Sequence, residues 1–219
     1  MRKNIAVLLS GCGAFDGSEI QESILTLLSI KQCDANYQCF SIDELQHHVT
    51  DHNSKSVDNN TIRNMLIESA RIARGDIKNI SELSADLYDA LIIPGGFGVA
   101  HNFCDFAITG KDFSVRSDIA RICLEFTKAE KPVGFICIAP VMIAKIYCGF
   151  KVKITIGNDT QVADIITSMG MKHVNTMVDE ICIDEKYKIV STPAYMLAEN
   201  IAQVYDGIFK LVSAVVKLM

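Results

Sequence analysis

The sequence predicts one α/β domain in which helices cover both faces of a mostly parallel β-sheet. Short apolar runs without polar alternation, typical of strands buried on both faces, alternate with segments whose apolar residues recur at helical spacing. No repeat or low-complexity linker divides the 219 residues, a length that suits one large domain or two small ones. With 49% hydrophobic and 21% charged residues, most of the chain can form a packed core. We therefore expect a single domain over residues 1–219.

The N-terminal part of the chain begins with a strand and a helix. Residues 4–9 form an apolar run that predicts a buried strand, and a loop with three glycines follows at residues 11–18. Ser18 or Asp16 could cap the next helix. The apolar stripe of that helix, which we expect to face the sheet, consists of Ile20, Ile24, Leu27 and Leu28.

A second strand, predicted at residues 37–42, precedes the most polar part of the chain. Residues 43–60 contain three histidines and three asparagines, and we expect this segment to be an insertion or a flap. A helix is predicted over residues 61–74. One side of that helix carries Ile62, Met65, Leu66, Ser69 and Ile72.

The rest of the chain continues the alternation of strands with helices. Strands are predicted at residues 89–94 and 133–136, on either side of an amphipathic helix at residues 115–128. A short strand near residues 152–156 and a hairpin across residues 181–190 follow. The last helix has one apolar stripe, formed by Leu197, Ile201, Val204, Ile208, Leu211 and Val215.

Three predicted loops lie at the carboxyl ends of strands, at residues 11–18, 95–100 and 137–140. In open α/β sheets, ligands bind beyond these ends, at the point where the strand order reverses. We therefore expect the three loops to meet in one crevice. The glycines of the first loop match neither a dinucleotide-binding fingerprint nor a phosphate loop ending in Lys-Ser/Thr, so a tight turn explains them better.

Cys137 is the candidate nucleophile of this crevice, because it follows a buried strand directly and Pro140 suits the first turn of a helix. A sharp strand-to-helix turn exposes a nucleophile, and a helix N-terminus favours a negative charge. We therefore expect Cys137 to have a lowered pKa and to be a thiolate near neutral pH. Its position alone equally allows a buried, inert thiol among the eight cysteines.

Backbone and carboxylate groups near Cys137 complete the candidate site. Glycines let a backbone approach closely, so the N–H groups of Gly96 and Ile138 could bind an oxyanion. Glu19 and Glu22 lie in the first turns of the first predicted helix. Glu22 is opposite the apolar stripe, so periodicity does not direct it toward the sheet, although a first-turn residue can point over the crevice.

Three histidines of the polar segment are candidate metal ligands. His47, His48 and His52 resemble a cluster, but no carboxylate or cysteine completes it, so a solvated flap is the better interpretation. We expect no metal site and no cofactor.

Four motifs together resemble the ThiJ/PfpI superfamily of the class I glutamine amidotransferase-like fold, and more narrowly the ElbB glyoxalase-like family that is named for isoprenoid biosynthesis. The motifs are Ser10-Gly11-Cys12-Gly13, Asp16-Gly17-Ser18-Glu19-Ile20-x-Glu22, Pro94-Gly95-Gly96-Phe97-Gly98 and Gly134-Phe135-Ile136-Cys137-Ile138-Ala139-Pro140. The narrower match is supported by Thr155-Ile156-Gly157 and by Thr192-Pro193-Ala194-Tyr195-Met196-Leu197-Ala198.

The resemblance implies a flavodoxin-like three-layer domain, a homodimer and a cofactor-free cysteine site. It implies that Cys137 is the nucleophile, that Glu22 is the carboxylate beside it and that Gly96 donates to an oxyanion. The chain departs from some members by having Ile138 where they carry histidine after the nucleophile. A late His-x-Glu is missing after His173, which argues against glutamine hydrolysis. His101 matches no family role, and a surface histidine is the default.

The function expected from this site is a glyoxalase-like conversion of glyoxal or methylglyoxal to a 2-hydroxy acid through a cysteine hemithioacetal. The alternative is a non-catalytic redox-sensing or interaction protein that uses an oxidisable Cys137. A dimer interface near the crevice is expected from the apolar segment at residues 138–147.

Charge and hydropathy exclude other classes of function. The net charge of −5 and the absence of a Lys/Arg run argue against nucleic-acid and anionic-membrane partners. The longest uncharged apolar stretch has twelve residues, whereas a membrane span needs about 20. The apolar run at residues 5–9 is shorter than the ~7–15 residues of a signal peptide core, so we expect a cytosolic protein.

Overall fold

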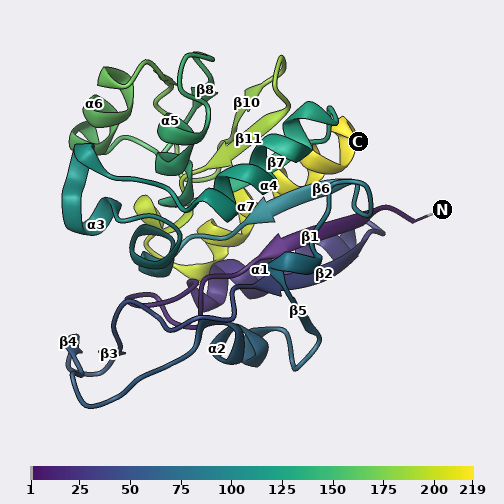
Figure 1. Ribbon diagram of the computed structural model, residues 1–219. Coiled ribbons are helices and arrows are strands. Elements are labelled where there is room, and N and C mark those ends of the chain that lie inside the picture. The colour runs from purple at the N-terminus through teal and green to yellow at the C-terminus, as the bar shows by residue number, and fades with distance from the viewer. Residues whose placement is uncertain (1) are drawn as a thin grey trace.

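A seven-stranded sheet forms the centre of the computed structural model, which describes residues 2–219 (Figure 1). Its strands are β1 (Asn4–Leu8), β2 (Asn36–Ser41), β5 (Ile77–Asn79), β6 (Ala90–Ile93), β7 (Val133–Ile136), β10 (Cys182–Asp184) and β11 (Ile189–Thr192). They lie in the order β10-β11-β7-β6-β1-β2-β5, and every pairing is parallel except that of β10 with β11. The five strands β2-β1-β6-β7-β11 follow the flavodoxin order 2-1-3-4-5, and β5 and β10 extend its two edges. The predicted α/β class is confirmed.

Helices cover both faces of this sheet, as predicted, and give three layers (Figure 1). Helices α1 (Ile20–Gln32) and α7 (Ile201–Leu218) pack on one face, and α4 (Ser117–Lys128) and α5 (Ile143–Ile146) pack on the other. Successive residues of β1 alternate between the two cores: Ile5 and Val7 contact the α1/α7 layer, and Ala6 and Leu8 contact the α4/α5 layer. Both faces of the central strands are therefore buried, which explains their unbroken apolar runs.

Smaller elements surround the three layers. They are α2 (Met65–Ile72), α3 (Phe106–Thr109), α6 (Thr160–Ser168), the hairpin of β3 (Thr50–Asp51) with β4 (Ser56–Val57), and the parallel pair β8 (Lys153–Ile154) with β9 (Lys172–His173). Five single-turn helical segments complete the described chain: η1 (Ile80–Glu82), η2 (Val99–Phe103), η3 (Gly110–Asp112), η4 (Ala139–Met142) and η5 (Ala194–Met196). Within residues 2–219, none of the helices has the length and apolar character needed to cross a membrane.

Several predicted elements need correction at their ends. The predicted strand at residues 152–156 contributes to the separate β8–β9 pair and not to the main sheet. Helix α2 begins at Met65 and not at residue 61, because the Asn64 side chain caps it by accepting the N–H of Ile67 at 3.0 Å. Helix α7 begins at Ile201, so Leu197 lies outside it. Strand β5 and helix α6 were not predicted, and the hairpin of β10 with β11 is confirmed.

Helix α1 is capped by a residue that the sequence did not suggest. The Glu19 carboxylate accepts the N–H of Glu22 at 2.6 Å and is the N-cap. Ser18 instead accepts the N–H of Ser10 at 2.8 Å, and Asp16 accepts the N–H of Thr50 at 2.7 Å. Both residues proposed as caps therefore hold the preceding loop together.

The orientation of α1 is the reverse of the prediction. Its buried side includes Glu22, Ser23 and Thr26, all 0% exposed. Ile20 and Ile24, expected to face the sheet, are 44% and 45% exposed. Leu28 is 45% exposed, and of the predicted stripe only Leu27 is buried.

The polar segment at residues 43–60 is only partly a flap. Its tip is the exposed β3–β4 hairpin, which projects from the body of the molecule (Figure 1). Its base is built into the loop after β1, since Gln46 is buried and its amide donates to the carbonyl of Asp16 at 3.1 Å. The segment therefore combines a fixed base with a solvated end.

Candidate functional site

The three loops predicted to meet at the carboxyl ends of β1, β6 and β7 lie against one another, backbone on backbone. A Cβ atom added at Gly96 would lie 2.4 Å from the N atom of Glu19. A Cβ atom added at Gly98 would lie 2.5 Å from Gly17. Only glycine permits such an approach, so these positions draw the first and second loops together. The predicted convergence is confirmed.

The glycine N–H groups of the loop after β1 are used within the protein and not offered to a phosphate. Gly13 donates to the carbonyl of Ser18 at 2.9 Å, and Gly17 donates to the carbonyl of Gly13 at 2.8 Å. Gly11 donates to the Ser69 hydroxyl at 2.9 Å. The interpretation as a tight turn is therefore confirmed.

Cys137 lies on a strained turn directly after β7. Its φ angle is +62°, a left-handed conformation that costs a non-glycine residue about 1–3 kcal/mol. Its N–H donates to the carbonyl of Thr192 at 2.9 Å, which extends the β7–β11 ladder by one residue and fixes the turn. The side chain is 8% exposed. Strain of this kind is typical of functional sites, although Cys137 is more enclosed than the prediction of an exposed nucleophile implied.

Glu22 reaches the same place from the first turn of α1. Its side chain is 0% exposed and is hydrogen-bonded to the Cys137 thiol. One carboxylate oxygen accepts the N–H of Gly95 at 3.0 Å, and the other accepts the N–H of Tyr195 at 3.2 Å. Burial and the neighbouring Glu19 raise the pKa of Glu22 to about 8, against these hydrogen bonds. Glu22 is therefore mostly protonated at neutral pH.

Gly95 permits this contact between thiol and carboxyl. A Cβ atom there would lie 2.5 Å from the Cβ atom of Cys137 and 2.7 Å from Oε2 of Glu22. Any side chain at this position would separate the two reactive groups. Both glycines of the Pro94-Gly95-Gly96 motif therefore contribute to the site. Gly95 leaves room for the thiol and the carboxyl group to meet, and Gly96 directs its N–H at the sulfur.

The expected thiolate character of Cys137 is wrong in direction. Burial, followed by the charge of Glu22 and its hydrogen bond, raises the pKa of the Cys137 thiol well above its ordinary value. Backbone N–H groups of Gly96 and Ile138 point at the sulfur and oppose that rise. The helical segment that follows, η4, has only four residues, so it offers little of the expected dipole. The thiol and the carboxyl compete for one negative charge in a nearly closed space.

The two contacts that Tyr195 makes at the site were not predicted from the sequence. Tyr195 donates its N–H to Glu22 and its hydroxyl to the side chain of Gln21. Burial raises the pKa of Glu19, whose carboxyl group caps α1 beside Glu22. Tyr195 belongs to a motif that supported only the family resemblance, and nothing in its spacing connects it with residues 173 positions earlier.

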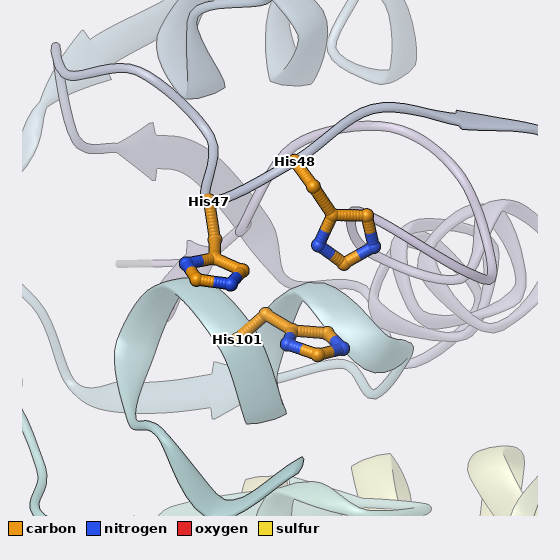
Figure 2. A group of neighbouring side chains, drawn as sticks. All are labelled: His47, His48 and His101. Carbon is orange, nitrogen blue, oxygen red and sulfur yellow. The ribbon is translucent and has the colours of Figure 1, made fainter. Parts of the chain in front are cut away.

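A separate group of histidines lies on the loop after β2 and on the turn η2. His47 and His48 meet His101, and His52 does not join them (Figure 2). His52 instead packs on Phe15, with 5.0 Å between ring centroids. The sequence therefore indicated two of the three histidines, and it placed His101 on the surface although that residue is half-buried.

Comparisons with known proteins cover nearly the whole chain. No protein-family model matches it. The mitochondrial ES1 protein homolog of Rattus norvegicus is 40% identical over 226 residues, which span 99% of this chain and 84% of the relative. The mitochondrial glutamine amidotransferase-like class 1 domain-containing protein 3 of Homo sapiens is 41% identical over 223 residues, spanning 98% and 82%. Because both names specify mitochondria, the cytosolic location of this chain stays a prediction.

Solved structures also resemble this chain over nearly its whole length. An isoprenoid biosynthesis protein with an amidotransferase-like domain from Ehrlichia chaffeensis has a TM-score of 0.92 and 37% identity, with 99% of each chain covered. DJ-1beta of Drosophila melanogaster has a TM-score of 0.59 at 13% identity, with 100% of this chain and 96% of that one covered, and shows a shared fold alone. The chain belongs to the family of ES1 proteins and isoprenoid biosynthesis proteins with a class I glutamine amidotransferase-like domain.

Proposed function

We propose that this protein is a cofactor-independent, glyoxalase-like enzyme that converts glyoxal or methylglyoxal to a 2-hydroxy acid. One observation carries the proposal: a buried, mostly protonated Glu22 is hydrogen-bonded to the Cys137 thiol, and two backbone N–H groups point at the same sulfur. A carboxyl group with a pKa of about 8 can both donate and accept a proton near neutral pH.

In the first step, the Cys137 thiol adds across the aldehyde C=O bond. A bond forms between sulfur and carbon, and the π electron pair moves to the aldehyde oxygen. The N–H groups of Gly96 and Ile138 hold that oxygen as its charge develops. Protonated Glu22 gives its proton to the oxygen and receives the thiol proton on its other carboxyl oxygen. The product is a hemithioacetal, and Glu22 is unchanged.

In the second step, Glu22 first releases its proton to solvent, and as a carboxylate it then moves a proton between the two carbons. It removes the proton from the carbon bonded to sulfur and returns it to the neighbouring carbonyl carbon. The hydroxyl proton passes to the second oxygen. The first carbon is thereby oxidised to a thioester and the second is reduced to a carbinol, so no external oxidant is needed. Water then cleaves the thioester, which releases the 2-hydroxy acid and the thiol.

The enclosure of the site supports a small substrate. Cys137 is 8% exposed and Glu22 is 0% exposed, so a two- or three-carbon dicarbonyl suits the opening better than a sugar adduct does. The same enclosure weighs against the alternative of a redox-sensing cysteine. Oxidation selects exposed thiols with a low pKa, whereas burial raises the pKa of the Cys137 thiol.

A steady-state glyoxal assay tests the proposal. We expect turnover in the wild-type protein and none above background in Cys137→Ser, because an alcohol is a far weaker nucleophile here. Cys148→Ser is the matched control, since Cys148 is an exposed free cysteine outside the site. Negligible wild-type turnover, together with ready oxidation of Cys137 to a sulfinate, would favour the redox sensor.

We also propose a homodimer, supported by a surface different from the one expected. The segment at residues 138–147 is mostly buried within the subunit and cannot supply the interface. Ile20, Ile24 and Leu28 form an exposed apolar stripe on α1, the helix that also carries Glu22, and a second copy of the chain can cover it about a two-fold axis. Sedimentation should give twice 24.1 kDa for the wild-type protein and a single 24.1 kDa species for Ile24→Lys. A wild-type species of 24.1 kDa would reject the dimer.

A further inference from the structure

Three histidines from two separate segments face a common space. His47 and His48 belong to the loop after β2, and His101 belongs to the π-helical turn η2 that follows β6. One ligand atom from each residue lies within 4.8 Å of the other two (Figure 2). The His48 and His101 rings approach edge to face at 4.5 Å between centroids. Single π-helical turns are rare and frequently mark functional sites.

The two segments are fastened to each other beside the histidines. Asn102 is 7% exposed, and its side-chain oxygen accepts the N–H of His47 at 2.8 Å. Its amide nitrogen donates to the carbonyls of Ser10 and Asp16, at 3.0 and 3.1 Å. The residue after His101 therefore fixes the backbone of His47 against the loop after β1. This arrangement holds the three imidazoles near one another before any ligand arrives.

One imidazole nitrogen of this group is buried without a partner. Nδ1 of His101 is one of four buried side-chain nitrogen or oxygen atoms in residues 2–219 that have no hydrogen-bond partner. A buried polar atom without a partner is uncommon in folded proteins, and a bound water or ion is an ordinary explanation. The lone pair of an unprotonated imidazole nitrogen binds a metal ion well.

We propose that His47, His48 and His101 bind a divalent transition-metal ion of the zinc class through three imidazole nitrogens. Imidazole suits zinc, copper and nickel, whereas magnesium and calcium require oxygen ligands that this group lacks. A tetrahedral zinc site with Zn–N bonds near 2.0–2.1 Å needs nitrogens about 3.3 Å apart. Rotation of the exposed His47 side chain can close the remaining gap. The fourth position is open to water or to a small anion.

Zinc titration of the metal-free protein, in competition with a chelator, tests the site. We expect each of His47→Ala, His48→Ala and His101→Gln to weaken zinc binding at least about 100-fold. Removing a residue that only hydrogen-bonds to a metal ligand already costs up to about 100-fold in affinity, and removing the ligand itself should cost no less. His52→Ala is the matched control from the same polar segment and should bind zinc as the wild type does. Equal zinc affinity in the wild type and in all three variants would overturn the proposal.

Cobalt(II) substitution separates this site from binding by the eight cysteines. We expect the visible absorption of a nitrogen-ligated ion, without thiolate charge-transfer bands, and we expect it to disappear in His47→Ala. The His47 side chain is exposed, so this variant should keep the thermal unfolding midpoint of the metal-free wild type. Thiolate bands that persist in His47→Ala would instead place the metal on cysteines and refute the histidine site. Neither readout depends on the activity of Cys137.

Discussion

Helices α1 and α4 cover opposite faces of the same sheet and differ in how they meet it. The buried side of α4 is apolar, as its periodicity predicts, and consists of Ile119, Ile122, Cys123 and Phe126. The buried side of α1 includes Glu22, Ser23 and Thr26, whereas Ile20 and Ile24 are exposed. Apolar periodicity thus determines the orientation of a helix that only packs. It fails for a helix whose orientation also delivers a carboxyl group to the site.

Two hydroxyl groups on the buried polar face of α1 are satisfied within the helix, whereas the hydroxyl of Ser29 on the same face has no partner. Ser23 donates its hydroxyl to the carbonyl of Glu19, and Thr26 donates to the carbonyl of Glu22, both at 2.7 Å. Once bonded in this way, serine and threonine pack as small, nearly apolar side chains. Hydropathy scales treat these residues as polar, so a helical wheel orients α1 incorrectly.

The largest expected effect contrasts one buried carboxyl group on α1 with one half-buried carboxyl group at the surface of α4. Glu22→Gln keeps the shape of the side chain but removes the group that moves protons. We expect kcat on glyoxal to fall by roughly 10²–10⁴ with little change in KM. Glu125→Gln is the control, because Glu125 pairs with Arg121 at the surface and lies outside the site. An equal loss in Glu19→Gln and none in Glu22→Gln would move the role to Glu19.

Truncating one isoleucine on α4 and one on α1 tests which side of each helix packs on the sheet, through the loss in the free energy of unfolding. Ile122 is 0% exposed, so Ile122→Ala should lower the free energy of unfolding by about 2–5 kcal/mol. Ile24 is 45% exposed, and Ile24→Ala should change the free energy of unfolding by no more than about 0.5 kcal/mol. Urea denaturation at low protein concentration measures both. Comparable losses would show that α1 packs through its apolar stripe after all.

The pH dependence of stability tests the burial of Glu22 directly. The pKa of Glu22 is about 8 in the folded protein, above the ordinary 4.5 expected when the chain unfolds. The contribution of Glu22 to stability is therefore fully present below pH 4.5 and is lost as pH rises toward 8. The slope is at most roughly 1.4 kcal/mol per pH unit. Urea denaturation between pH 5 and 8 should show a shallower decline for Glu22→Gln than for the wild type, and identical slopes would contradict the buried acid.

The smallest expected effect is that of metal removal on turnover. The proposed chemistry moves protons between Cys137 and Glu22, and neither residue belongs to the histidine group. EDTA should therefore leave kcat on glyoxal unchanged while it lowers the thermal unfolding midpoint of zinc-loaded protein, since a ligand that binds only the folded state stabilises it. Loss of turnover in EDTA, restored by zinc, would connect the two sites.

Sequence reasoning predicted well those features that depend on local pattern. Buried strands with unbroken apolar runs, such as β1 and β7, were placed within one residue. The loops at their ends were expected to converge because parallel strands end at the same edge. Cys137, Glu22, Gly96 and Ile138 were proposed together, and the fold brings them together.

Features that depend on distant partners could not be predicted. The pKa of Cys137 is set by enclosure and by Glu22, which lies 115 positions earlier, and not by its place before a helix. His101 joins His47 only because two loops are tied through Asn102. The capping role of Glu19 became visible only once Ser18 and Asp16 were found bonded elsewhere.

The glycine contacts between the loops also limit how the substrate range of this protein could be redesigned. Gly17, Gly96 and Gly98 meet backbone to backbone, so these positions offer no side chain to shorten and no room to add one. A variant that admits a bulkier aldehyde must be sought at the half-buried Ile138 and Tyr195. A library that varies these two positions and keeps the three glycines constant would search most of the accessible specificities with few unfolded members.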